Sequence, residues 1–286
     1  MDVQLLVVPY DSGQRGARMG AGPERLLEAG IEQTLTDQGH RVQTTLIALP
    51  PESWTSEIGT GFELMRRVSA AITARPGSMP VILAGNCINT VGAVASRSPS
   101  PTGVVWFDAH GDFNTPDTTT SGFLDGTALS TIVGRSWREL ALTVPGFRPL
   151  PEEFVCVVGA RDLDPLERRL LSESRVALIG AAEIRSALPA ATASLARRVP
   201  STHVHIDLDV LDASVARANS YAVGGGLDLE TMEFALSLIG QDLQITGMTL
   251  SAYDPAEDSD GRAARAAIRL VSAAVSVAQG TSLDRT

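Results

Sequence analysis

Carboxylate and imidazole side chains gather where two apolar segments of the sequence end. The first segment, residues 104–107, runs into Asp-Ala-His-Gly-Asp, and the second, residues 203–206, runs into Asp-Leu-Asp. Side chains two residues apart in an extended chain point to the same face, so each run presents its acids together. The side chains grouped in this way are Asp108, His110 and Asp112 in the first run, and Asp207 and Asp209 in the second.

Four carboxylates and one imidazole gathered in one place repel one another unless cations lie between them. Oxygen-rich sites with a single imidazole suit Mn²⁺ or a similar divalent ion, and two such ions polarise a shared water at neutral pH. Acids that merely face solvent or cap helices would explain one Asp-x-Asp pair, but they explain two paired runs poorly. The spacing therefore indicates a binuclear metal centre.

The composition excludes several other functions. The 286 residues include no lysine, which rules out a Schiff-base lysine, a pyridoxal-phosphate anchor and a Walker-type lysine on a phosphate. A net charge of −10 argues against nucleic acid or an anionic membrane as a partner. The sequence shows neither a membrane-spanning apolar stretch nor the basic region of a signal peptide, and its two cysteines, Cys87 and Cys156, do not make a disulfide scaffold. We expect a cytoplasmic protein with a small-molecule partner.

The two runs need a scaffold, and short apolar, β-branched segments recur along the chain to provide one. Strands are predicted at residues 3–8, 44–49, 80–84, 103–107, 154–159, 176–180, 203–208 and 245–251. Helices are predicted at residues 23–38, 56–74, 164–172, 181–198, 229–240 and 262–279. This alternation is typical of a three-layer α/β/α fold with a mainly parallel sheet of about eight strands, and uneven strand spacing disfavours a closed barrel.

We expect one domain over residues 1–286, with a frayed tail from residue 280 onward. Irregular segments at residues 112–144 and 212–226 each follow a predicted strand. Loops at the carboxyl ends of parallel strands carry the chemistry of α/β proteins, so these two loops are expected to border the site.

The two runs resemble the motifs of a known family. The stretch Asp-Ala-His-Gly-Asp-Phe-Asn-Thr-Pro from Asp108, with the Thr-Thr-Thr-Ser-Gly that follows, closely resembles the D-A-H-x-D motif and loop of the ureohydrolases, and of arginase in particular. Residues 207–212 are similar to the family's second metal motif, and Gly22-Pro23 and residues 161–165 also match. The resemblance begins near Leu6 and reaches the C-terminus. It implies an arginase-like fold, two Mn²⁺ ions, hydrolysis of guanidino groups and the homo-oligomers common among members.

The resemblance also assigns metal ligands by position. Asp108 and Asp207 would bridge the ions, His110 and Asp209 would complete one site, and Asp112 would ligate the other ion and hold the activated water. The sixth ligand of the family is a histidine in a G-G-D-H motif, where this sequence reads Ala-Gly-Asn-Cys and ends at Cys87.

The cysteine at this position leaves two alternatives open. A Cys87 thiolate is a softer ligand than imidazole, and it would lower Mn²⁺ affinity or favour Zn²⁺ or Fe²⁺. A neutral thiol would leave that ion weakly bound. We expect Cys87 to be a weak or labile ligand.

The substrate positions follow from the same resemblance. Asn114 and Ser121 match the loop residues that hold an α-carboxylate, Asp164 matches the acid that recognises an α-ammonium, and Glu167 lies close by. An intact amino-acid head group carries both charges. These positions therefore favour an arginine-like amino acid over an agmatine-type substrate, which lacks the carboxylate.

Two departures from the family pattern fall at the reacting end. Asp125 stands where the family has a histidine assigned to proton shuttling, and Ala252 replaces the glutamate of an E-x-N-P motif that pairs with the guanidinium. The loss of that anion weakens the binding of a fully cationic guanidinium. We therefore expect a less basic guanidine, Nω-hydroxy-L-arginine, hydrolysed to L-ornithine and hydroxyurea as in the family branch that serves D-cycloserine biosynthesis.

Asp112 is the expected proton donor to the departing amine. Asp125 is a weaker candidate, because a solvated carboxylate is ionised at neutral pH. Two alternatives remain: an ordinary arginase that forms L-ornithine and urea, and a catalytically inactive relative that acts as a binding protein. The other five ligands and the head-group residues are intact, which favours an active hydrolase.

Overall fold

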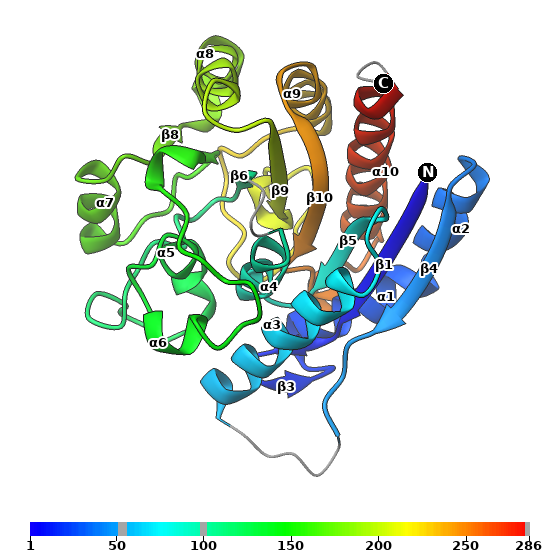
Figure 1. Cartoon of the computed structure of the whole chain (residues 1–286), viewed down its shortest axis with the longest axis horizontal. Coiled ribbons are helices and arrows are strands. Elements are labelled where there is room, and N and C mark those ends of the chain that lie inside the picture. The colour runs from blue at the N-terminus through cyan, green and yellow to red at the C-terminus, as the bar shows by residue number, and fades with distance from the viewer. Residues whose placement is uncertain (51–55, 98–101, 284–286) are drawn as a thin grey trace.

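Eight strands form one sheet in which every pairing is parallel (Figure 1). The structure is a computed structural model that describes residues 1–50, 56–97 and 102–283. The strand order is β4-β1-β5-β10-β9-β6-β7-β8. The strands are β1 (Asp2–Val8), β4 (Arg41–Leu46), β5 (Met79–Ala84), β6 (Thr102–Phe107), β7 (Val155–Val158), β8 (Ala177–Ile179), β9 (Ser201–Asp207) and β10 (Gln244–Ser251). The predicted parallel sheet of about eight strands is confirmed.

Helices cover both faces of this sheet, because alternate residues of each central strand point to opposite sides. On β6, Val105 and Phe107 join a core with the helices of one face, while Val104 and Trp106 join a core with those of the other. The first face carries α1 (Gly22–Glu28), α2 (Ile31–Asp37), α8 (Ile184–Ala196), α9 (Leu229–Asp242) and α10 (Arg262–Leu283). The second carries α3 (Glu57–Thr73), α4 (Thr90–Ala95), α5 (Ala128–Ile132), α6 (Arg138–Ala141) and α7 (Pro165–Ser172). The three-layer prediction is therefore confirmed.

Some elements differ from the prediction. The helix expected over residues 23–38 is broken into α1 and α2 at Gly30, whose φ of 91° lies in the left-handed region that glycine tolerates. The loop at residues 112–144 contains α5 and α6, and the short hairpin of β2 (Tyr10–Asp11) and β3 (Gln14–Arg15) was not predicted. Helix α10 continues to Leu283, so the first part of the tail expected to fray is helical, and residues 284–286 lie outside the described residues.

The central strands β5, β10, β9 and β6 lie side by side and end at the same edge. Phe107 of β6 pairs with Ile206 of β9, so Asp108 and Asp207 leave the sheet as neighbours. Ser251 of β10 pairs with Asp207 on the other side of β9. No helix in the described part of the chain is long and apolar enough to cross a membrane.

Candidate metal centre and active site

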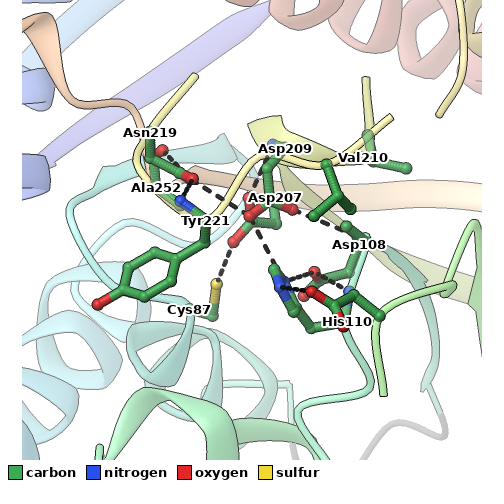
Figure 2. A network of polar contacts seen from close by, with 12 residues as sticks. Cys87, Asp108, His110, Asp207, Asp209, Val210, Asn219, Tyr221 and Ala252 are labelled. Atoms are coloured by element: carbon green, nitrogen blue, oxygen red, sulfur yellow. Dashed lines mark hydrogen bonds and ion pairs between the residues drawn. The ribbon is translucent and has the colours of Figure 1, made fainter. Parts of the chain in front are cut away.

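A cavity of about 230 Å³ opens at this edge of the sheet. The predicted site residues that line it are Cys87, His110, Asp112, Asn114, Ser121, Asp125, Asp164, Glu167, Asp207 and Asp209. Asp108, the remaining predicted residue, is fully buried and lies directly against His110 (Figure 2). The structure thus brings the sequence-predicted residues together, from the four segments that follow β5, β6, β7 and β9.

The first group of ligand atoms belongs to Asp108, His110 and Asp209, which lie within 4.8 Å of one another. Nδ1 of His110 is 3.3 Å from Oδ1 of Asp108 and 3.5 Å from Oδ2 of Asp209. The indole Nε1 of Trp106 donates to the second oxygen of Asp108 at 3.0 Å, which fixes the orientation of that carboxylate. One imidazole and two carboxylates in this arrangement form a nitrogen–oxygen donor set for a divalent ion.

The buried carboxylates of the site favour the binding of positive charge. Burial alone disfavours the charged ring of His110, but its hydrogen bond to Asp108 and the charge of Asp209 outweigh burial and raise its pKa to about 10. Burial, and then the charge of Asp108, raise the pKa of Asp112 well above its usual range. Oδ2 of Asp112 is buried and finds no hydrogen-bond partner in the described residues. An orphaned carboxylate oxygen among further carboxylates fits a site made for cations.

A second group of ligand atoms belongs to Cys87, Asp108 and His205, which also lie within 4.8 Å of one another and are all buried. The sulfur of Cys87 is 3.1 Å from Oδ2 of Asp207 and 3.1 Å from Oγ of Ser251. Burial raises the pKa of the Cys87 thiol, and the nearby carboxylates raise it further. Asp108 belongs to both groups, as expected of a carboxylate that bridges two ions.

His205 is a residue that the sequence analysis missed. It lies two residues before Asp207 on β9, so the two-residue period that grouped the aspartates also places it on their face. Nothing else in the sequence set it apart from a histidine packed in the core.

Asn219 was also missed, although it lies in a loop that was expected to border the site. Its amide donates to Oδ2 of Asp209 at 3.3 Å and to the carbonyl of Ala252 at 2.8 Å (Figure 2). It therefore connects one predicted ligand to the position where the guanidinium-pairing glutamate is absent. Ala252 lines the cavity with a φ of 62°, a strained conformation for a residue other than glycine.

The side chain of Arg161 holds the same loop by binding the loop's backbone carbonyl groups. Its half-buried guanidinium donates to the carbonyl of Asp209 at 2.9 Å, and on the far side of the loop to the carbonyls of Val223 at 3.0 Å and Gly224 at 3.1 Å. Further donations reach Gly159, Val210 and Leu211. A single side chain thereby fixes the path of the chain that carries Asp209 and Asn219.

The expectation that Asp125 is solvated is wrong. The carboxylate is buried, accepts from the backbone N–H of Ile88 at 2.7 Å, and accepts from the amide of Asn86 at 3.0 Å. Burial raises its pKa to about 7 against the effect of these hydrogen bonds. A carboxyl group with this pKa exchanges a proton near neutral pH.

The residues expected to bind the amino-acid head group lie on another part of the cavity wall. The amide of Asn114 donates to Oδ2 of Asp164 at 3.1 Å, and Ser121 is exposed at the rim. Glu167 is buried behind them, where it accepts from the N–H of Phe113 at 2.8 Å, and burial raises its pKa to about 7. Tyr221 also lines the cavity, with its ring perpendicular to that of His110 at a centroid distance of 6.5 Å.

Comparison with known proteins gives one consistent match. The model of the arginase family matches residues 1–276. An arginase of Staphylococcus aureus is 28% identical over 291 residues, which cover 94% of this chain and 95% of that protein. The arginase structure from Bacillus caldovelox has a TM-score of 0.87 at 24% identity and covers 96% of this chain and 97% of its own. An arginase structure from Bacillus subtilis has a TM-score of 0.84 at 26% identity and covers 96% of this chain and 98% of its own.

Proposed function

The chain belongs to the arginase family, whose members are hydrolases of amidino and guanidino groups, and from this premise we propose that it hydrolyses Nω-hydroxy-L-arginine to L-ornithine and hydroxyurea with two bound divalent ions. The observation that supports this substrate is Ala252. It lines the cavity together with Cys87 and Asp207, and its methyl group offers no charge to a guanidinium. The N-hydroxyl group makes a guanidine less basic, so the substrate needs less counter-charge.

The buried donor atoms fit two ions. Asp108, His110 and Asp209 would hold one of them, and Cys87, Asp112 and Asp207 would hold the other, with Asp108 and Asp207 shared. When bound, two divalent ions supply the Lewis acidity that activates water for attack on a guanidine carbon. Mn²⁺ is our assignment for the nitrogen–oxygen site, and a softer ion is compatible with the sulfur of Cys87.

The cavity wall opposite these ligands would bind the amino-acid end of the substrate. The carboxylate of Asp164 would accept from the α-ammonium, while the amide of Asn114 and the hydroxyl of Ser121 would donate to the α-carboxylate. Asn114 and Asp164 are already held together at 3.1 Å, so their donor and acceptor are positioned before the substrate arrives. A substrate that lacks either charge leaves one of these groups unpaired.

The departing ornithine nitrogen needs a proton. Asp112 would relay one, since its Oδ2 is buried at the cavity wall and has no hydrogen-bond partner in the described chain. Asp125 is a second proton carrier at the cavity wall, because its pKa of about 7 permits both loss and gain of a proton at neutral pH. Glu167, with a pKa of about 7, would stabilise the loop at Phe113 that carries Asn114.

An ordinary arginase that releases urea is the second candidate. It is supported by the curated relatives, which are named arginase. The two candidates differ in the charge of the substrate's guanidine group at Ala252. L-arginine brings a fully cationic guanidinium there, and Nω-hydroxy-L-arginine brings a less basic guanidine.

The deciding experiment measures L-ornithine release by Mn²⁺-loaded protein, with L-arginine and Nω-hydroxy-L-arginine in parallel assays. We expect kcat/KM for the hydroxylated substrate to exceed that for L-arginine by tenfold or more, about 1.4 kcal/mol of transition-state binding. Equal turnover of the two, or preference for arginine, would establish the arginase alternative. Release from neither substrate, with metal bound, would exclude both.

A further inference from the structure

The buried imidazole of His205 has no role in the reaction described above, yet it lies at the base of the metal centre. One of its nitrogens is within 4.8 Å of both the sulfur of Cys87 and a carboxylate oxygen of Asp108. Those two atoms are themselves candidate ligands, so the imidazole completes a sulfur–nitrogen–oxygen group. The whole group is buried.

The contacts of the ring place Nε2 beside Ser251, whose hydroxyl also contacts Cys87. Nδ1 is 2.8 Å from Oγ1 of Thr90, which occupies that nitrogen. Nε2 is 3.4 Å from Oγ of Ser251, and the same hydroxyl is 3.1 Å from the sulfur of Cys87. The ring stacks on Trp106 with centroids 3.5 Å apart, so it cannot turn over easily.

This is the arrangement that metal-binding histidines have. One ring nitrogen is held by a hydrogen bond that fixes the ring, and the other presents its lone pair to the ion. The aromatic platform comes from the same residue, Trp106, that orients the carboxylate of Asp108. One indole thus positions two members of the group.

We propose that His205 is a metal ligand and that, with Cys87 and Asp108, it forms a site selective for a thiophilic divalent ion such as Zn²⁺. This inference rests on the binuclear centre of the proposed function and adds a ligand to it. His205 lies on β9, and its imidazole would bind the same ion that Cys87 binds from the end of β5. Thiolate and imidazole are the donors that Zn²⁺ and Co²⁺ prefer, whereas the Asp108–His110–Asp209 group suits Mn²⁺.

The two ions of this centre are then of different kinds. Asp108 belongs to both groups, with a carboxylate oxygen within 4.8 Å of the ligand atoms of Cys87 and His205 in one and of His110 and Asp209 in the other. The Oδ2 of Asp207, 3.1 Å from the Cys87 sulfur, is a further oxygen donor beside this group.

The test uses the metal-free full-length protein and Co²⁺ as a coloured probe for the sulfur site. A Co²⁺–thiolate bond gives a near-ultraviolet charge-transfer band, and the visible bands report the other ligands. His205→Asn keeps a hydrogen-bonding atom close to Thr90 but removes Nε2. We expect this variant to bind the first equivalent of Co²⁺ at least about tenfold more weakly, with altered visible bands and the thiolate band retained.

Two variants complete the set. Cys87→Ser should lose the thiolate band. The matched control is His203→Gln, because His203 is also buried on β9, two residues earlier, and its Nε2 is 2.9 Å from Oγ1 of Thr249, outside the group. It should keep wild-type affinity and spectrum.

X-ray absorption of wild-type protein with one equivalent of Zn²⁺ tests the ligand set without any variant. One sulfur and one imidazole bound to the same zinc are the expected result. Sulfur without imidazole, or an unchanged Co²⁺ affinity and spectrum in His205→Asn, would show that His205 only packs the core. Normal metal binding with release of ornithine from neither substrate would overturn the proposed function and leave the His205 site standing.

Discussion

The sulfur of Cys87 and Oδ2 of Asp207 lie 3.1 Å apart at the ends of two strands that have one strand between them. Without metal, the thiol proton lies between them, since burial and the surrounding carboxylates raise the pKa of Cys87. A cation in this position takes the place of that proton. The contact therefore marks where metal affinity can be altered by one substitution.

Cys87→His should tighten Mn²⁺ binding by about tenfold or more without abolishing turnover, because an imidazole donor suits this ion better than a thiol that must first lose its proton. Competition with a fluorescent chelator measures the affinity. Cys156→Ser is the matched control, as Cys156 is a free, buried cysteine of β7 away from the cavity. Equal Mn²⁺ affinities for wild type and Cys87→His would mean that Cys87 is not a ligand.

Ala252→Glu should shift preference toward L-arginine, raising its kcat/KM relative to the hydroxylated substrate by roughly tenfold or more, because a carboxylate returns beside the guanidinium. Ala252→Gln has the same shape without the charge and should not produce this shift. Both substitutions retain the left-handed backbone of this residue, so their strain is matched. An equal shift in the two variants would assign the effect to size.

Metal-free protein should lose stability as the pH rises from about 6.5 to about 8. The pKa values of Asp125 and Glu167 are raised to about 7 in the folded protein, whereas the unfolded chain releases the same protons at lower pH. The free energy of unfolding therefore falls as the pH rises through this interval. His110 acts with the same sign, since its pKa is raised to about 10.

Bound metal should reverse this trend, because its ligands bind in their deprotonated forms. The difference in Tm between Mn²⁺-loaded and chelator-treated protein should therefore grow with pH across the same interval. Calorimetry at constant ionic strength measures both curves. A metal-free Tm that climbs with pH would contradict the raised pKa values.

Arg161→Ala should lower the free energy of unfolding by about 2–4 kcal/mol, because several carbonyl groups lose a charged donor at once. Metal affinity should fall with it, since the backbone of Asp209 is among those carbonyls. Chemical denaturation and metal titration measure the two effects. Arg168→Ala, which removes an exposed arginine of α7, should change stability by less than about 0.5 kcal/mol.

The strands and the convergence of the aspartates were predictable because both depend on local pattern. Continuous apolar runs specify buried parallel strands, and the two-residue period places Asp207 and Asp209 on one face. The break at Gly30 was missed because the helical spacing continues across it, although a glycine at this point is a local signal for the end of a helix.

The rest of the site depends on contacts between distant segments. Asp125 is buried because Asn86 and Ile88, from the end of β5, cover its carboxylate. His205 and Cys87 come from strands that β10 separates, and both contact the hydroxyl of Ser251 on β10. Neither relationship has a signature in the local sequence.

The contacts of Arg161 have a consequence for how this active site changes during evolution. Every group that its guanidinium is seen to bind is a backbone carbonyl, so this anchor of the loop at residues 209–224 does not depend on which side chains the loop carries. Tyr221 can be exchanged without loss of that anchor, while its ring borders the cavity. The loop is thus a place where new substrate preferences can arise by single substitutions, and where a directed-evolution library would retain folded variants.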